Sequence, residues 1–237
     1  MAHFDPNEVG MRPPPFKHTV YNALVVPRPI GWISTVSPDG DFNLAPFSFF
    51  AQVSGSPPCV IYCPNYFKPG TRESKDSLTN AEDTGEFVYN MCTAELLDQM
   101  VVTSKHSPRN FDEMKEAGLE GVPCEKVGPP RLKNSPIAME CKHMQTIDMP
   151  TPQDGSRAAM VLGHVVQIHV ADEVITDEGL IDMRKLRPVG RLGYYDYTIV
   201  EPENIFPYKT PDDDRFHGHE SKAWDEIQPR VEEFVQE

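Results

Sequence analysis

The stretch that decides the fold runs from Pro27 to Phe50: Pro27-Arg28-Pro29-Ile30-Gly31-Trp32-Ile33-Ser34-Thr35-Val36-Ser37-Pro38-Asp39-Gly40-Asp41-Phe42-Asn43-Leu44-Ala45-Pro46-Phe47-Ser48-Phe49-Phe50. An extended apolar run reaches the pair Ser34-Thr35, and a return run carries Asn43, Ser48 and aromatic rings. The turn residues Pro38-Asp39-Gly40 between the two runs predict a β-hairpin. Its polar groups stand where a flat, phosphorylated ligand could bind.

The rest of the chain predicts more strands than helices. Apolar runs bounded by turn residues predict strands at 20–26, 30–36, 42–50, 60–63, 86–91, 137–147, 158–171 and 192–200, and short helices at 76–83, 94–102 and 110–117. Parallel strands need crossover helices, and few segments here are long enough to supply them. The pattern therefore favours a mainly β fold with short helices, closed into a barrel.

The two ends of the chain differ from its middle. Residues 1–15 are polar and rich in proline, which predicts an extended arm before a barrel domain over 16–205. In the extension 206–237, Trp224, Ile227, Val231 and Phe234 recur at helical spacing. We expect an amphipathic helix there, acting as a dimer clasp or a lid.

Charge and composition exclude several classes of partner. The 237 residues carry a formal net charge of −14, which disfavours nucleic acid and anionic membrane surfaces as partners. No apolar run is long enough to span a bilayer, and no signal peptide is visible. Five widely spaced cysteines without a Cys-x-x-Cys pair indicate reduced thiols, so we expect a cytoplasmic protein.

A phosphate site is predicted at Lys75-Asp76-Ser77. A lysine just before a helix places its charge beside free backbone N–H groups and the positive end of the helix dipole. The same pattern is common in ordinary capped helices, so it gains weight only together with Ser34-Thr35 and Asn43. The pair His217 and His219, near Asp212-Asp213-Asp214, more often has no role, and no metal site is predicted.

Six separated pieces together resemble the flavin reductase-like family with the FMN-binding split barrel. Two of them, 27–35 and 43–50, belong to the stretch quoted above. The other four are Lys75-Asp76-Ser77-Leu78, Gly85-Glu86-Phe87-Val88-Tyr89-Asn90, Gly163-His164-Val165-Val166-Gln167-Ile168-His169-Val170 and Pro188-Val189-Gly190-Arg191-Leu192-Gly193. The resemblance covers about residues 18–200 in the family's order.

This resemblance implies a homodimer that binds FMN, or FAD as the alternative flavin. It places Ser34, Thr35, Lys75, Asp76 and Ser77 near the phosphate. Asn43, Ala45 and Ser48 would stand near the ring and ribityl chain, and Arg191 would be a further ligand contact. The chain departs from the family pattern at His164, a position often acidic, and at Tyr194, a position often glycine. Both are candidates for the substrate side, and no catalytic acid or base is assigned.

Three functions remain open at this point. The first is an oxidoreductase that takes hydride from NADH or NADPH and supplies reduced flavin to a partner monooxygenase or another acceptor. The second is a flavoprotein that holds FMN tightly for electron transfer, metal reduction or oxygenation of a specific substrate. The third is a flavin-binding module without turnover. Gly-x-Gly-x-x-Gly is absent, so a nicotinamide nucleotide would bind outside a Rossmann domain.

Overall fold

The computed structural model describes residues 1–150, 155 and 157–207. Contacts divide the chain into two units, Met1–Pro202 and Glu203–Glu237. The predicted helix with Trp224 and Val231, and the pair His217 and His219, lie outside the described residues.

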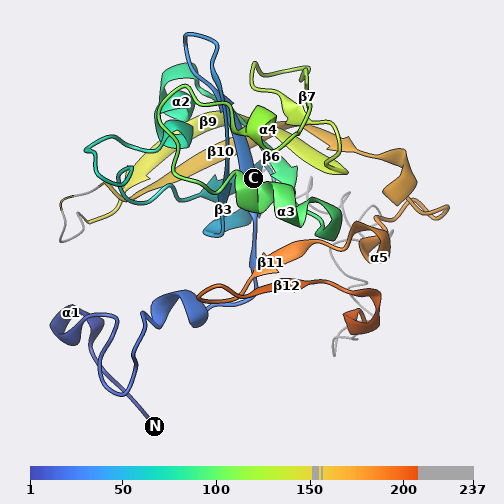
Figure 1. Ribbon diagram of the computed structural model, residues 1–237. Coiled ribbons are helices and arrows are strands. Elements are labelled where there is room, and N and C mark those ends of the chain that lie inside the picture. The colour runs from blue at the N-terminus through green and yellow to red at the C-terminus, as the bar shows by residue number, and fades with distance from the viewer. Residues whose placement is uncertain (151–154, 156, 208–237) are drawn as a thin grey trace, which may run out of the picture. The chain divides into compact units, whose positions relative to one another are not determined.

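Strands dominate the described residues (Figure 1). They are β1 (Arg28–Pro29), β2 (Gly31–Val36), β3 (Phe42–Phe47), β4 (Phe50–Gly55), β5 (Pro58–Tyr62), β6 (Glu86–Met91), β7 (Gly121–Val122), β8 (Arg131–Leu132), β9 (Ile137–Asp148), β10 (Ala159–Val170), β11 (Val189–Arg191) and β12 (Tyr197–Ile199). The helices are α1 (Pro6–Val9), α2 (Asp76–Thr84), α3 (Leu97–Val102), α4 (Glu113–Glu116) and α5 (Met183–Leu186). Short 3-10 turns are η1 (Tyr21–Ala23), η2 (Ala94–Leu96), η3 (Asp172–Val174) and η4 (Pro202–Asn204).

The main sheet has seven antiparallel strands in the order β3-β2-β6-β9-β10-β5-β4. Its two outer strands, β3 and β4, are consecutive in the chain and separated only by Ser48 and Phe49. The sheet must therefore curl round to bring its edges together, which makes a barrel open along one seam. A second sheet, β1-β11-β12, joins the start of the barrel to a late hairpin.

Strand β2 is buried on both faces, which explains its nearly continuous apolar sequence. Ile33 belongs to the core inside the barrel with Tyr62 and Phe87, whereas Trp32 belongs to a second core beside helix α3. Successive side chains of a strand point to opposite faces. The neighbours Ser34 and Thr35 must therefore also separate, with Ser34 on the face of Trp32 and Thr35 on the face of Ile33.

Three predicted strands differ from the structure. Residues 20–26 form the turn η1 instead of a strand, and the Arg28 guanidinium holds this turn by donating to the carbonyls of Asn22 and Val25. The run 42–50 is broken between β3 and β4, where the chain passes from one edge of the sheet to the other. The run 192–200 contributes only β12 (Tyr197–Ile199), because residues 192–196 turn the chain back from β11.

Other predictions match the structure closely. Strand β6 has the predicted bounds, and helix α2 ends one residue beyond its predicted bound, before the left-handed Gly85 with φ of 74°. Strand β10 has a register shift between Leu162 and Gly163, where the Phe87 ring lies so close that a Cβ on Gly163 would be 2.3 Å from it. All five cysteines are free. Within the described ranges, every helix is too short or too polar to serve as a bilayer span.

Candidate flavin site

The amino end of helix α2 borders a cavity of about 190 Å³, which we call the helix-end cavity. Its wall is formed by Asn43, Ala45, Pro46, Phe47, Lys68, Lys75, Asp76, Ser77, Glu113 and residues 103–107. The helix is nine residues long, and no side chain caps its amino end. Free backbone N–H groups at such an end, together with the helix dipole, attract an anion.

Asp76 and Ser77 are residue types that often cap a helix, but neither caps this one. Lys75 occupies the cap position without a side-chain hydrogen bond. The Asp76 carboxylate is turned to Lys68 Nζ at 2.7 and 2.8 Å, and the Ser77 hydroxyl accepts from Asn43 Nδ2 at 3.1 Å. Both candidate caps are thus engaged elsewhere, which leaves the amino end open to a ligand.

Positive charge is concentrated around this helix end. Lys68 is buried against Asp76, and Arg109 Nη1 lies 3.6 Å from the same carboxylate. Lys75 Nζ lies 3.3 Å from His106 Nδ1. Burial, and then the neighbouring Lys68, lower the pKa of Lys75, while burial and Lys75 lower the pKa of His106. A neutral His106 can accept a hydrogen bond from the Lys75 ammonium and orient it.

One carboxyl group in this wall behaves differently from Asp76. Glu113 on α4 is 6% exposed, and its Oε2 accepts from the backbone N–H of Leu44 at 3.2 Å. Burial raises the pKa of Glu113 and the charge of Asp76 adds to that effect. The hydrogen bond ties helix α4 to strand β3 beside the cavity, so Glu113 stabilises the wall.

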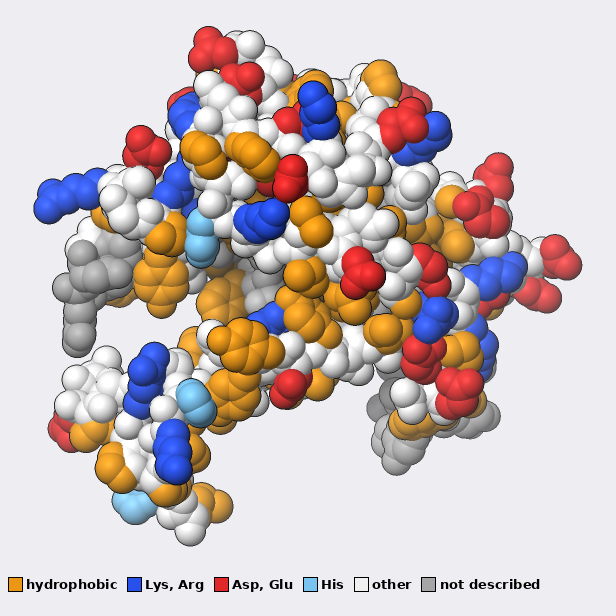
Figure 2. Space-filling model, viewed as in Figure 1, with side chains coloured by type: hydrophobic (Ala, Val, Ile, Leu, Met, Phe, Trp, Pro, Cys, Tyr) orange, Lys and Arg blue, Asp and Glu red, His pale blue; other side chains and the backbone are white. Residues whose placement is uncertain are grey.

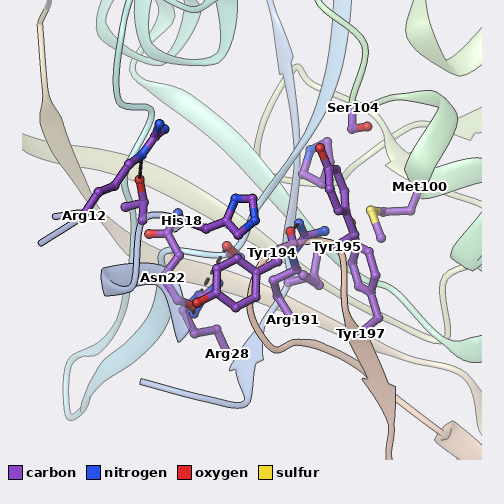
Figure 3. Close-up of a pocket in the computed structure, with 14 residues that line it drawn as sticks. Arg12, His18, Asn22, Arg28, Met100, Ser104, Arg191, Tyr194, Tyr195 and Tyr197 are labelled. Atoms are coloured by element: carbon purple, nitrogen blue, oxygen red, sulfur yellow. Dashed lines mark hydrogen bonds between the residues drawn. The ribbon is translucent and has the colours of Figure 1, made fainter. Parts of the chain in front are cut away.

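A second cavity of about 600 Å³ lies between the barrel and the β1-β11-β12 sheet; we call it the arginine cavity. Its wall is formed by Arg12, His18, Thr19, Asn22, Arg28, Ile30, Pro46, Ser48, Met100, Ser104, Arg191, Tyr194, Tyr195 and Tyr197 (Figure 3). Figure 2 shows the surface hollowed between the N-terminal segment and the body above it, with hydrophobic side chains along the hollow.

The two cavities adjoin, because Pro46 and Ser104 line both of them. Pro46 lies on β3 and Ser104 follows α3, so the junction is built by the edge of the barrel and the helix beside it. A ligand with a phosphate at one end and a flat ring at the other could therefore extend from the helix end into the arginine cavity. Together the two volumes fall in the range of cofactor pockets, about 300–1,000 Å³.

The geometry brings most of the predicted site residues to these two cavities. Asn43, Ala45, Lys75, Asp76 and Ser77 line the helix-end cavity, and Ser48, Arg191 and Tyr194 line the arginine cavity. Thr35 lines neither. Its hydroxyl accepts from the amides of Asn43, at 3.2 Å, and Asn80, at 3.1 Å, and so supports Asn43 from behind.

Two predicted residues lie away from the cavities. Ser34 is fully buried on the other face of β2, where its hydroxyl donates to the Pro130 carbonyl at 2.6 Å and accepts from Asn90 Nδ2 at 3.2 Å. Strand alternation makes this separation from Thr35 unavoidable, so Ser34 does not face the helix-end cavity. His164 on β10 pairs in register with Cys59 and Lys142 and lines neither cavity.

Several wall residues were not identified from the sequence. Lys68 lies in the loop just before Lys75, whereas His106 and Glu113 lie about 30 residues or more further along the chain, and none of the three belongs to a recognisable motif. Arg28 lies between Pro27 and Pro29 in the stretch that predicts the hairpin, and this position was the one feature of the sequence that could have identified it as a site residue. Arg12 lies in the segment predicted to be an extended arm.

A further buried cluster, with Cys124, Glu140 and His169, lies outside both cavities. Glu140 is fully buried and accepts from the backbone N–H groups of Glu125, at 2.9 Å, and Lys126, at 2.6 Å, and from His169 Nε2 at 2.6 Å. A buried carboxylate with three donors is fully satisfied. We therefore assign it a structural role, holding the loop before β8 against the barrel.

Comparison with known proteins agrees with this arrangement. An uncharacterized protein of Aquifex aeolicus is 37% identical over 177 residues, which cover 73% of this chain and 85% of that protein. The reductase subunit HsaB of a flavin-dependent monooxygenase from Mycobacterium tuberculosis is 29% identical over 182 residues, or 76% of this chain and 80% of that subunit. The crystal structure of nitrilotriacetate monooxygenase component B from Bacillus cereus superimposes with a TM-score of 0.77 at 26% identity, covering 88% of this chain and 98% of that one.

The predicted fold class, a mainly β split barrel, is confirmed, because solved flavin reductases with a split barrel domain share this architecture. The family model for the flavin reductase like domain matches residues 23–196. That range contains the barrel, the amino end of α2 and most of the arginine cavity. The chain therefore belongs to the flavin reductase like domain family.

Proposed function

We propose that this protein is an FMN-dependent oxidoreductase that takes hydride from NADH or NADPH. The flavin phosphate would bind in the helix-end cavity and the flavin ring would lie across Pro46 into the arginine cavity. The observation that carries the proposal is the uncapped amino end of α2, with Lys75 and Ser77 beside it, opening toward a second and larger cavity.

The residues present fit a phosphorylated flavin. A phosphate needs cations, hydroxyls and backbone N–H groups, and Lys75, Ser77 and the first turn of α2 supply them. The pKa of the half-buried Lys75 is lowered by burial and by Lys68, and a facing anion would stabilise its charged form. Thr35 and Asn43 keep the Ser77 hydroxyl in place through the hydrogen bonds described above.

The flat ring would find both apolar cover and polar contacts. Pro46 and Met100 provide apolar surface, and Ser48 offers a hydroxyl held by Arg28 Nε at 3.4 Å. The bound flavin would supply the redox chemistry, accepting a hydride and passing its electrons on. The protein's part is to bind and orient the ring, and to place the Arg28 charge near it. Hydride transfer to a flavin held in this way requires no catalytic acid or base.

The first test is an absorbance spectrum of the purified protein with added FMN or FAD, followed by NADH or NADPH without oxygen. We expect flavin bands that bleach on addition of a nucleotide, and the faster nucleotide is the donor. Failure of both flavins to bind would refute the proposal. Bands that persist with both nucleotides would favour a flavin-binding module without this activity.

The rate of FMN dissociation separates the two redox alternatives. Rapid exchange is expected of a reductase that supplies reduced flavin to a partner monooxygenase, and the similar HsaB is named as the reductase subunit of a flavin-dependent monooxygenase. Slow exchange would favour FMN as a prosthetic group for electron transfer or for a specific substrate. Gel filtration of the flavin-loaded protein followed by a spectrum makes this measurement.

We also propose that the protein is a homodimer. Leu24, Val25 and Tyr195 are 66%, 71% and 93% exposed and lie in segments that border the arginine cavity. Exposed apolar side chains of this size commonly mark an interface. Light scattering on a sizing column should give twice the mass of the chain, and a strictly monomeric protein at micromolar concentration would refute this part of the proposal.

A further inference from the structure

The charges of the arginine cavity are unbalanced. Arg12, Arg28 and Arg191 line it together with His18, and none of the described residues along its wall is acidic. Within 1–150, 155 and 157–207, none of these three guanidinium groups forms an ion pair. The whole chain carries a net charge of −14, so a local excess of cations without acids needs a specific reason.

Two of these arginines are brought together by the second sheet. Arg28 of β1 and Arg191 of β11 are directly paired in the antiparallel register. Arg28 is only 8% exposed, and burial followed by the charge of Arg191 lowers its pKa. Like charges held this close repel each other, and an anion between or beside them would relieve the repulsion.

Aromatic groups surround the cations. The Arg191 guanidinium lies 4.3 Å from the centre of the Tyr197 ring, which fixes the plane of its donor groups. The rings of His18 and Tyr194 meet edge to face at 6.0 Å, and Tyr194 and Tyr195 belong to the same β11–β12 hairpin as Arg191 (Figure 3). Arg191 Nη2 donates to the Tyr194 carbonyl, which holds the guanidinium in place while its charge has no acidic partner among the described residues. The wall therefore offers flat surfaces for a ring and a positioned cation for an anionic group.

Arg12 approaches from the opposite wall. Its Nε donates to the Thr19 hydroxyl at 3.0 Å, and this bond leaves both terminal nitrogens available among the described residues. Planar guanidinium groups bind carboxylates through two parallel hydrogen bonds. A carboxylate between Arg12 and Arg191 would reach donors from both the N-terminal segment and the β11–β12 hairpin.

We propose that the arginine cavity binds a single-ring aromatic carboxylate, with its carboxylate on Arg12 and Arg191 and its ring against the tyrosines. This deepens the proposed function, since it rests on the flavin ring reaching the same cavity and names the class of organic substrate. The phosphates of a nicotinamide nucleotide are the competing anion for these arginines, and ADP-ribose is included in the test to separate the two.

The test is calorimetric titration of the FMN-loaded protein with benzoate and, separately, with its neutral isostere benzamide. We expect benzoate to bind at least about tenfold more tightly than benzamide, and Arg191→Gln and Arg12→Gln each to remove most of that difference. Arg191→Lys should restore part of it, because a lysine keeps the charge but loses the fork. Lys133→Gln, an exposed lysine paired with Glu120, is the matched control and should bind benzoate unchanged.

Three results would overturn the proposal: equal affinity for benzamide, benzoate binding that survives both arginine substitutions, or arginine-dependent binding of ADP-ribose with no binding of benzoate. The last result would assign the charges to the nucleotide. The same titrations are repeated on protein without flavin. Arginine-dependent benzoate binding to a protein that takes up no FMN would refute the proposed function and the substrate role together, and would leave only a carboxylate-binding site at these arginines.

Discussion

The two cavities differ in how the charges of their cationic side chains are balanced. In the helix-end cavity, the buried Lys68 is matched by Asp76, with side chains about 10% and 11% exposed. In the arginine cavity, Arg12, Arg28 and Arg191 have no acidic partner among the described residues. In the first site the charge of Lys68 is therefore balanced by the protein's own ion pair. In the second, Arg28 and Arg191 donate to backbone carbonyls but their charges are not balanced by an acidic group of the described residues.

The two cavities also differ in how firmly their walls are held. The helix-end cavity is built on α2 and on β3 of the main sheet, whose side chains are fixed by buried hydrogen bonds such as those of Thr35. The arginine cavity is closed by the turn η1 and by residues 192–196, where Tyr195 is 93% exposed. The helix-end cavity therefore suits a group that stays bound, and the arginine cavity suits a group that enters and leaves.

Removing the acid from the balanced site should have the largest effect. Asp76→Asn leaves Lys68 buried without a charge partner, and we expect it to lower the free energy of unfolding by about 3 kcal/mol. Urea denaturation at neutral pH measures this loss. Glu120→Gln, which breaks the exposed pair with Lys133, is the control and should change stability little. Equal losses in both variants would show that the buried pair is no more important than a surface pair.

Removing the cation that faces the ligand should have the next largest effect. Lys75→Met is expected to weaken FMN binding about thirtyfold, since a charged hydrogen bond contributes about 2 kcal/mol. Quenching of flavin fluorescence measures the affinity. Lys105→Met is the control from the same cavity, because Lys105 is 61% exposed and pairs with Glu116. If the two variants bind FMN alike, Lys75 does not contact the phosphate.

A change of shape should disturb the second cavity and leave the first intact. A Cβ on Gly193 would lie 2.6 Å from Cβ of Ala23, so Gly193→Ala must push the N-terminal segment away from the β11–β12 hairpin at a cost of about 1 kcal/mol. We expect nucleotide-dependent flavin reduction to slow while FMN affinity changes less than reduction does. Gly55→Ala, which meets no atom within 4 Å, is the control. A matching loss of FMN affinity would contradict the separation of the two sites.

The smallest effect should be a pH dependence of FMN binding. Only the charged form of Lys75 attracts phosphate, and its pKa is lowered by burial and by Lys68, so affinity should fall as the pH rises and should begin to fall earlier than for an ordinary lysine. The bound phosphate in turn raises the pKa of Lys75, so binding takes up protons on the alkaline side. Lys75→Met should abolish this dependence, and a wild-type affinity that stays constant to high pH would contradict it.

The sequence by itself predicted many of the elements and several residues that line the helix-end cavity. Local patterns predicted strand β6 and helix α2, because turns and helix ends depend on adjacent residues, and the anion site at Lys75 stays a prediction. A period of two also implies that Ser34 and Thr35 face opposite ways. The two hydroxyls therefore cannot both face one phosphate, and Ser34 is a buried core residue.

Only the tertiary structure decided which distant residues share a cavity. Lys68 and His106 reach Lys75 from separate loops, and the antiparallel register alone places Arg28 beside Arg191. It also decided that 20–26 is a turn, because the Arg28 side chain binds its carbonyls. The pairing of Arg28 with Arg191 joins segments more than 150 residues apart, and no local preference of the chain specifies it.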